Sequence, residues 1–157
     1  MTIAIDQSKL RRIMDTILAG ETLSRDEGTT LLQIAQLAAG ADDTEQPVER
    51  ALLQGLAQRI SSLNGVQPAE LIAIPPIQGF RARMARFRTL AATLQTRTAR
   101  ELGFAVAFLV AISDLELQSS ERETLDELQH ALGVDHRRAT DIVVQLTEII
   151  ASSRRAA

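Results

Sequence analysis

The chain has 157 residues and a formal net charge of −3, with 45% hydrophobic and 24% charged residues, as expected of one folded globular domain. It contains no cysteine, which excludes disulfide scaffolds, cysteine-ligated zinc, iron–sulfur clusters and thiol catalysis. Tyrosine and tryptophan are also absent and histidine occurs twice, so the chain has few residues that stack on bases or sugars and no histidine-rich metal site.

Apolar residues recur three and four positions apart along nearly the whole chain, which predicts helices and no sheet. Residues that favour helix starts, through a capping side chain or a first-turn proline, stand at Ser24, Pro47, Pro68, Ser120 and Asp135. Glycines that favour helix ends stand at Gly20, Gly40, Gly65 and Gly133. Ser24 with Glu27, and Ser120 with Glu123, have the spacing of a capping box. These signals predict a single all-α domain of seven or eight helices over residues 1–157.

Pro75-Pro76 interrupts the chain near its midpoint, because neither proline fits a helix interior. Isoleucines on both sides favour a packed elbow over a flexible linker. Helices are expected beyond it at about residues 79–94 and 98–112. The second is apolar on most sides around Phe104–Ile112, so we expect it to be the buried central helix. Six residues are predicted to be buried in the core: Leu37, Leu56, Leu109, Leu128, Ile142 and Leu146.

An internal repeat underlies this plan. Residues 33–60 align without a gap on residues 105–132, a shift of 72 positions, and nine of the 28 aligned positions are identical. Four of the identical residues are polar and lie in or next to the loop, which helical periodicity alone does not produce. We therefore predict two repeats, at about 8–74 and 79–152, that pack as one pseudo-symmetric bundle.

The repeated segment is AAGADDTEQPVERALL in the first copy and VAISDLELQSSERETL in the second. A helix rich in alanine and valine, an aspartate, a polar turn, Glu-Arg and helically spaced leucines, present twice, resembles the TerB-like tellurite-resistance domain. The resemblance implies an all-helical, cytosolic bacterial domain linked to metal and chemical stress response. It further implies a binding or adaptor module, often near a membrane complex, rather than an enzyme, and divalent metal binding through the loop acids.

The loop acids are the candidate metal ligands: Asp42, Asp43, Glu45, Glu49, Asp114, Glu116 and Glu121. Carboxylates suit calcium or magnesium, although the calcium loop of an EF-hand is absent. The alternative is a solvated loop, because acids in the first turn of a helix are stabilised by its dipole without metal. The resembled family has glycine after the loop aspartate, where this chain has Asp43 and Leu115. We expect both loops at the same end of the bundle, with tighter binding in the first.

Residues 81–100 contain six arginines and no acidic residue. Such a run is typical of a surface for a protein partner, nucleic acid or an anionic membrane, and also of an ordinary solvated helix face. The lack of exposed aromatic candidates and the overall acidity weigh against nucleic acid. The candidate partner-binding residues are Arg81, Arg83, Arg86 and Arg88.

No catalytic constellation is found. Glu127 and His130 have the spacing of one half of a carboxylate di-iron site, but the repeat places Gln58 at the position of His130, so the second half is missing. A small metal-dependent enzyme is therefore the less favoured alternative to a binding module. The N-terminus has no signal-peptide pattern, and the apolar stretch Phe104–Ile112 is far shorter than the ~20 residues of a membrane span, so we expect a cytoplasmic protein.

Overall fold

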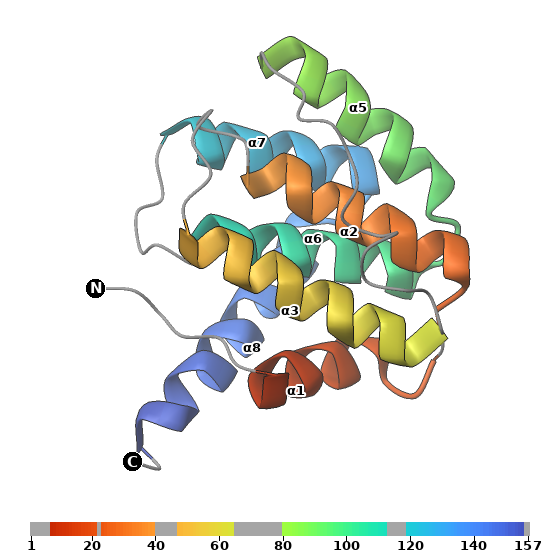
Figure 1. The fold of residues 1–157 in the computed structure, drawn as a ribbon. Coiled ribbons are helices and arrows are strands. Elements are labelled where there is room, and N and C mark those ends of the chain that lie inside the picture. Colours follow the sequence, from red (N-terminus) through yellow and green to blue (C-terminus); the bar gives the residue numbers. More distant parts are fainter. Residues whose placement is uncertain (1–6, 22, 40–46, 65–79, 113–118, 156–157) are drawn as a thin grey trace.

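The computed structural model describes residues 7–21, 23–39, 47–64, 80–112 and 119–155, and every regular element in these ranges is an α-helix (Figure 1). The seven helices in the described residues are α1 (Gln7–Leu18), α2 (Arg25–Ala39), α3 (Pro47–Asn64), α5 (Phe80–Thr93), α6 (Arg97–Ile112), α7 (Ser119–Leu132) and α8 (His136–Arg155). The all-α prediction is confirmed for this part of the chain. The predicted helix from Pro68 and the Pro75-Pro76 elbow lie outside the described residues. None of the described helices has the length and hydropathy needed to cross a membrane.

Helix starts follow the capping signals of the sequence. The Ser24 N–H donates to Glu27 Oε1 at 3.1 Å, and the Glu27 N–H donates to Ser24 Oγ at 3.1 Å. This reciprocal pair is the predicted capping box of α2, and it satisfies N–H groups that a helix start leaves unpaired. Asp135 precedes α8 in the same way, and its Oδ1 accepts the Arg138 N–H at 2.7 Å. α3 begins at Pro47, as predicted.

The end of α7 is closed by a left-handed residue, Gly133, whose φ is 68°. The Gly133 N–H donates to the His130 carbonyl at 3.1 Å, and the Val134 N–H donates to the Gln129 carbonyl at 3.2 Å. This pair of bonds is a Schellman motif, which occupies carbonyls that would otherwise lack a partner at a helix end. The predicted stop at Gly133 is therefore confirmed.

Two predicted boundaries are shifted, by one residue at the end of α1 and by two residues at the start of α7. The turn after α1 is already left-handed at Ala19, with φ of 50°, and stays so at Gly20, with φ of 88°. α7 begins at Ser119, so Ser120 lies inside the helix and not in the capping position predicted for it. Local sequence signals place a helix end only to within one or two residues, because the terminal turns adjust to their surroundings.

The core is built around α6, which packs against α1, α2, α3, α7 and α8 (Figure 1). Eleven of its 16 residues are buried, so the prediction of a central helix is confirmed. Gly103 allows the close packing, since an added Cβ would lie 3.3 Å from Leu94 and 3.5 Å from Ile34 and Leu132. The six residues predicted for the core are all buried: Leu37, Leu56, Leu109, Leu128, Ile142 and Leu146.

α2 and α6 lie against each other and run in the same direction, from right to left in Figure 1. Their N-terminal ends are joined, because Thr96 Oγ1 donates to Glu27 Oε2 at 3.3 Å. The C-terminal ends of both helices, and the first residues of α3 and α7, consequently lie at the left of the view. The two inter-helix connections thus depart from the same side of the bundle.

The left-handed turn at Gly133 yields a stability prediction. We expect Gly133→Ala to lower the unfolding free energy by about 1 kcal/mol, because an alanine Cβ disfavours positive φ. An added Cβ would meet only Arg100 Nη1, at 3.9 Å, so the loss reflects backbone conformation and not a clash. The melting temperature should fall by roughly 2–4 °C. Gly133→Asn is the control and should lose less, since asparagine tolerates this conformation; equal losses would contradict the explanation.

Candidate functional site

Most of the predicted metal ligands lie outside the described residues: Asp42, Asp43, Glu45, Asp114 and Glu116. Glu49 and Glu121 do fall in described helices, where each is the third residue, of α3 and α7 respectively. Within the described ranges, no three histidine, aspartate or glutamate residues come together as a metal ion would require. The loop-acid hypothesis therefore stays a prediction.

The helix ends next to those loops have a defined electrostatic character. α2 and α6 end on one side of the bundle, and each helix C-terminus carries the negative end of its dipole. Negative dipole ends favour a nearby cation by about 0.3–1 kcal/mol each at exposed positions. α3 and α7 begin on the same side and bring two positive dipole ends to it, so the dipoles of the four helices offset one another there.

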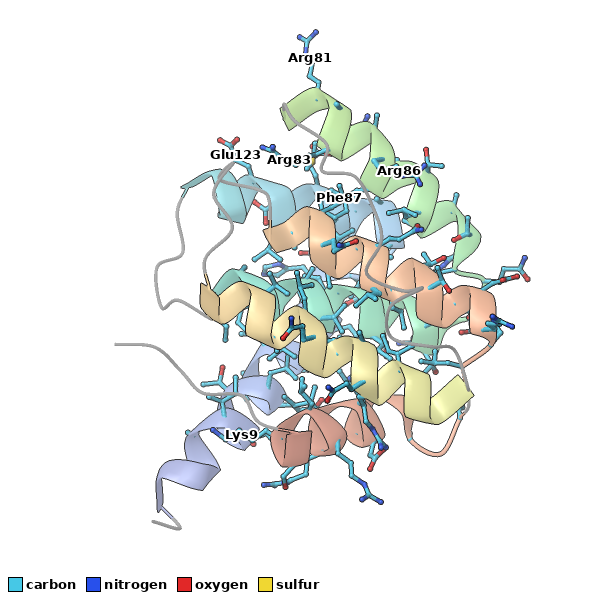
Figure 2. All side chains as sticks on the ribbon, viewed as in Figure 1. Lys9, Arg81, Arg83, Arg86, Phe87 and Glu123 are labelled. Carbon is cyan, nitrogen blue, oxygen red and sulfur yellow. The ribbon has the colours of Figure 1, made fainter. Side chains whose placement is uncertain are left out.

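The arginine run of residues 81–100 is divided by the structure into residues with different surroundings. Arg83 is only 3% exposed and sits among the buried residues of α5, next to Met84 and one turn before Phe87 (Figure 2). The assignment of Arg83 to a partner-binding surface is therefore wrong. The reason is that it lies on the flank of the helix that turns towards the core.

Two further arginines of the run contribute to the packing of α6. Arg97 Nε lies 3.3 Å from Glu101 Oε1, one turn further along the same helix. Arg100 Nε donates to the Leu94 carbonyl at 2.7 Å and so occupies a carbonyl just beyond the end of α5. Both side chains therefore already form contacts within the chain, which the run of arginines in the sequence did not indicate.

Arg81, Arg86 and Arg88 are the exposed arginines of α5. Arg81 points away from the bundle at the start of the helix (Figure 2). Arg88 Nη2 lies 3.2 Å from Glu127 Oε2 on α7. Neither Arg81 nor Arg86 forms an ion pair with a residue that the structure describes. Within the described part of the chain, the exposed face of α5 thus carries two positive charges that have no ion-pair partner.

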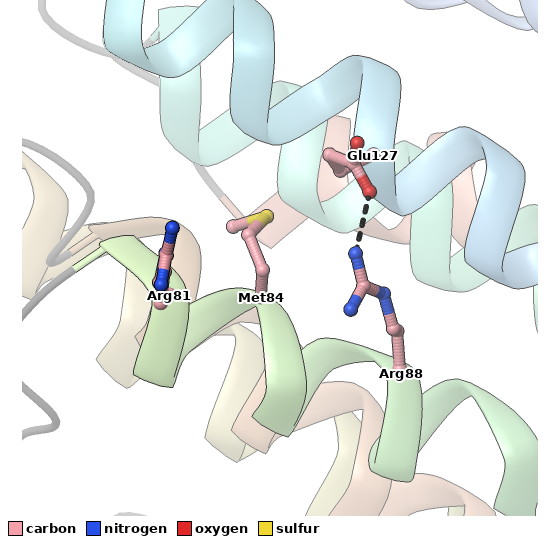
Figure 3. A pocket seen from close by; sticks show the side chains of 4 residues that line it. All are labelled: Arg81, Met84, Arg88 and Glu127. Atoms are coloured by element: carbon pink, nitrogen blue, oxygen red, sulfur yellow. Dashed lines mark hydrogen bonds and ion pairs between the residues drawn. The ribbon is translucent and has the colours of Figure 1, made fainter.

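A groove of about 300 Å³ lies between α5 and α7 and is lined by Arg81, Met84, Arg88 and Glu127 (Figure 3). Arg81 and Arg88 are two helical turns apart, roughly 10 Å along the axis, and Met84 lies between them. Of the described lining residues, two carry a guanidinium group and one carries a carboxylate, so their net charge is positive. Guanidinium groups bind carboxylates and phosphates through directed, charge-assisted hydrogen bonds, so the groove is suited to an anion.

One buried ion pair escaped the sequence analysis. The Glu101 side chain is only 9% exposed and accepts two bonds from Arg138 on α8, from Nε at 2.9 Å and from Nη2 at 3.2 Å. The hydrogen bond from Arg138 to Glu101 raises the pKa of the arginine above its ordinary value, so Arg138 stays charged at physiological pH. The available signal was a carboxylate directly before the apolar run of α6, which requires a partner when buried.

Comparison of the chain with known proteins gives no match to a protein-family model, to a curated protein sequence or to a solved structure. The function is therefore inferred from the residues and their arrangement.

The buried pair yields a second stability prediction. We expect Glu101→Gln to lower the unfolding free energy by about 2 kcal/mol, since it leaves a partly buried arginine without its counter-ion. Glu127→Gln is the matched control and should cost less than about 1 kcal/mol, because the Arg88–Glu127 pair is exposed. Urea unfolding measures both, and equal costs would show that Glu101 does not anchor α8.

Proposed function

We propose that this chain is a non-enzymatic binding module of the TerB-like kind, which recruits an acidic protein partner through the face formed by α5 and α7. One observation carries the proposal: Arg81 and Arg88 line the same groove, where Glu127 is the one carboxylate among the described lining residues, while Arg81 and Arg86 have no ion pair among the described residues. Exposed cations that have no ion pair among the described residues are available to a partner. The bacterial stress context comes from the sequence resemblance and belongs to the same proposal.

We propose further that two copies of one helical unit form the bundle. α2 and α6 begin at residues 25 and 97, and α3 and α7 begin at residues 47 and 119, each pair 72 positions apart. The caps are also 72 positions apart, since Thr96 Oγ1 accepts the Ala99 N–H at 3.1 Å as Ser24 Oγ accepts that of Glu27. Packing pairs correspond as well, with α1 on α3 as α5 on α7, and α2 on α3 as α6 on α7. These correspondences support a duplicated unit.

The binding face is tested with a fluorescein-labelled hexaglutamate peptide and fluorescence anisotropy at low salt. We expect the full chain to bind the peptide, and Arg81→Gln combined with Arg86→Gln to weaken binding roughly tenfold, if each charge contributes about 0.7 kcal/mol. Added salt should also weaken binding, because exposed charges are screened.

Arg137→Glu is the charge-matched control, since it lowers the net charge by two, as the double variant does, at an exposed position on α8. It should bind the peptide as the wild type does. An equal loss in both variants would show that overall charge, and not the α5 face, drives binding. Phosphatidylserine vesicles and duplex DNA are assayed in parallel. Arginine-dependent binding to either of these without peptide binding would replace the protein partner by a membrane surface or nucleic acid.

Divalent metal binding by the two acidic loops is the second candidate function. It is favoured by the placement of the loops, because α2 and α6 end, and α3 and α7 begin, on the same side of the bundle. The proposed ligands are the seven loop acids named in the sequence analysis, with calcium or magnesium as the ion.

Metal binding predicts a thermal shift. Calcium or magnesium at about a hundred times the dissociation constant should add about 2.7 kcal/mol of stability and raise the melting temperature by roughly 5–10 °C. Asp42→Asn with Asp114→Asn should abolish the shift and slightly stabilise the metal-free protein, because like charges repel. Asp42→Asn alone should reduce the shift more than Asp114→Asn alone. Asp141→Asn with Glu148→Gln on α8 is the charge-matched control, and a wild type that does not respond to millimolar calcium would rule out calcium binding.

A further inference from the structure

We propose that Glu127 is a built-in competitor for the acidic partner of the α5–α7 groove. Its carboxylate occupies, on Arg88, the place that a carboxylate of the partner takes when the partner binds. The inference rests on the proposed function, since it concerns how the same groove is controlled. The partner that it specifies is a segment with at least two carboxylates, one for each end of the groove.

The Arg88–Glu127 pair has the properties of an exchangeable contact. A single bond of 3.2 Å joins Arg88 Nη2 to Glu127 Oε2 across the groove, from α5 to α7 (Figure 3). The two side chains are 65% and 45% exposed, so water reaches both partners. Ion pairs in such surroundings contribute little to stability, and another carboxylate can replace Glu127 at small cost.

Glu101, in the same bundle, forms an ion pair that lacks these exchangeable properties. Glu101 is almost fully buried and binds Arg138 through two parallel hydrogen bonds, with Arg97 as a third contact. Burial and two-point geometry make that pair costly to open. The Arg88–Glu127 contact has neither feature, so it is suited to exchange and not to holding helices together.

The groove is also asymmetric. Arg88 at one end is occupied by Glu127, whereas Arg81 at the other end has no ion pair with any described residue. An acidic segment can therefore bind Arg81 first without displacing anything. Only a second carboxylate, roughly 10 Å further along the groove, gains a contact by replacing Glu127 on Arg88. Glu127 thus reduces the gain from the second carboxylate and leaves binding at Arg81 unaffected.

The test is a double-mutant cycle on Arg88 and Glu127, read out by the binding of labelled hexaglutamate peptide to the full chain. Glu127→Gln should bind the peptide about two- to fivefold more tightly than the wild type, since removal of an exposed ion pair frees Arg88. Arg88→Gln should bind more weakly. In the Arg88→Gln background, Glu127→Gln should improve binding by less than twofold, because no guanidinium remains to be released.

Glu123→Gln is the matched control, since Glu123 is exposed on the same helix, one turn earlier, and does not line the groove. It removes the same charge and should improve binding by less than twofold. All the substituted side chains are exposed or half-exposed, and unchanged melting temperatures will show that the variants are folded. Equal gains from Glu127→Gln and Glu123→Gln, or the same gain with and without Arg88, would overturn the competitor role alone.

If the proposed acidic-partner function is wrong, the same peptide-binding experiments give a different result. If neither the wild type nor Glu127→Gln binds the peptide, or if both bind it independently of Arg81 and Arg86, the acidic-partner function and the competitor role are both overturned. If Glu127→Gln binds while wild-type binding is too weak to measure, the competitor role is supported. Binding only to phosphatidylserine vesicles would assign the groove to a membrane surface and overturn the inference.

Discussion

The burial of α6 is the constraint on which the other elements of this bundle depend. α6 packs against five described helices, and small residues along it, such as Gly103 and Ala107, leave room for its neighbours to approach closely. A helix enclosed in this way cannot leave a carboxylate without a partner, since desolvating a lone charge is costly. Glu101 therefore requires Arg138, and this requirement anchors the first turn of α8 to the centre of the bundle.

Because α2 and α6 are parallel, their N-termini lie together at one end of the bundle and their C-termini lie together at the other. At one end the capping groups of both helices meet, where Glu27 accepts bonds from Ser24 and Thr96. At the other end both helices present negative dipole ends, next to the starts of α3 and α7. Because α3 and α7 begin at this same end, their positive dipole ends offset the negative dipole ends of α2 and α6.

The arginines of residues 81–100 show how one run of like charges is divided among several roles. Arg83 is buried, Arg97 and Arg100 stabilise the start of α6, and Arg88 pairs with Glu127 across a groove. Arg81 and Arg86 are the exposed arginines of α5 without an ion pair to a described residue, and the proposed partner surface is confined to them and the Arg88–Glu127 pair. A count of charges overestimates this surface, because side chains on one helix differ in whether a second helix covers them.

The sequence by itself determined the helices, several of their ends and the central place of α6, because these depend on residues a few positions apart: the Ser24–Glu27 box, Gly133, and the apolar run of α6. Only the tertiary structure decided which charges meet. Glu101 and Arg138 are 37 residues apart, and Arg88 and Glu127 are 39 apart. Each pair forms between side chains of different helices. Its distance and exposure are set by how those helices pack, which no pattern within a single helix specifies.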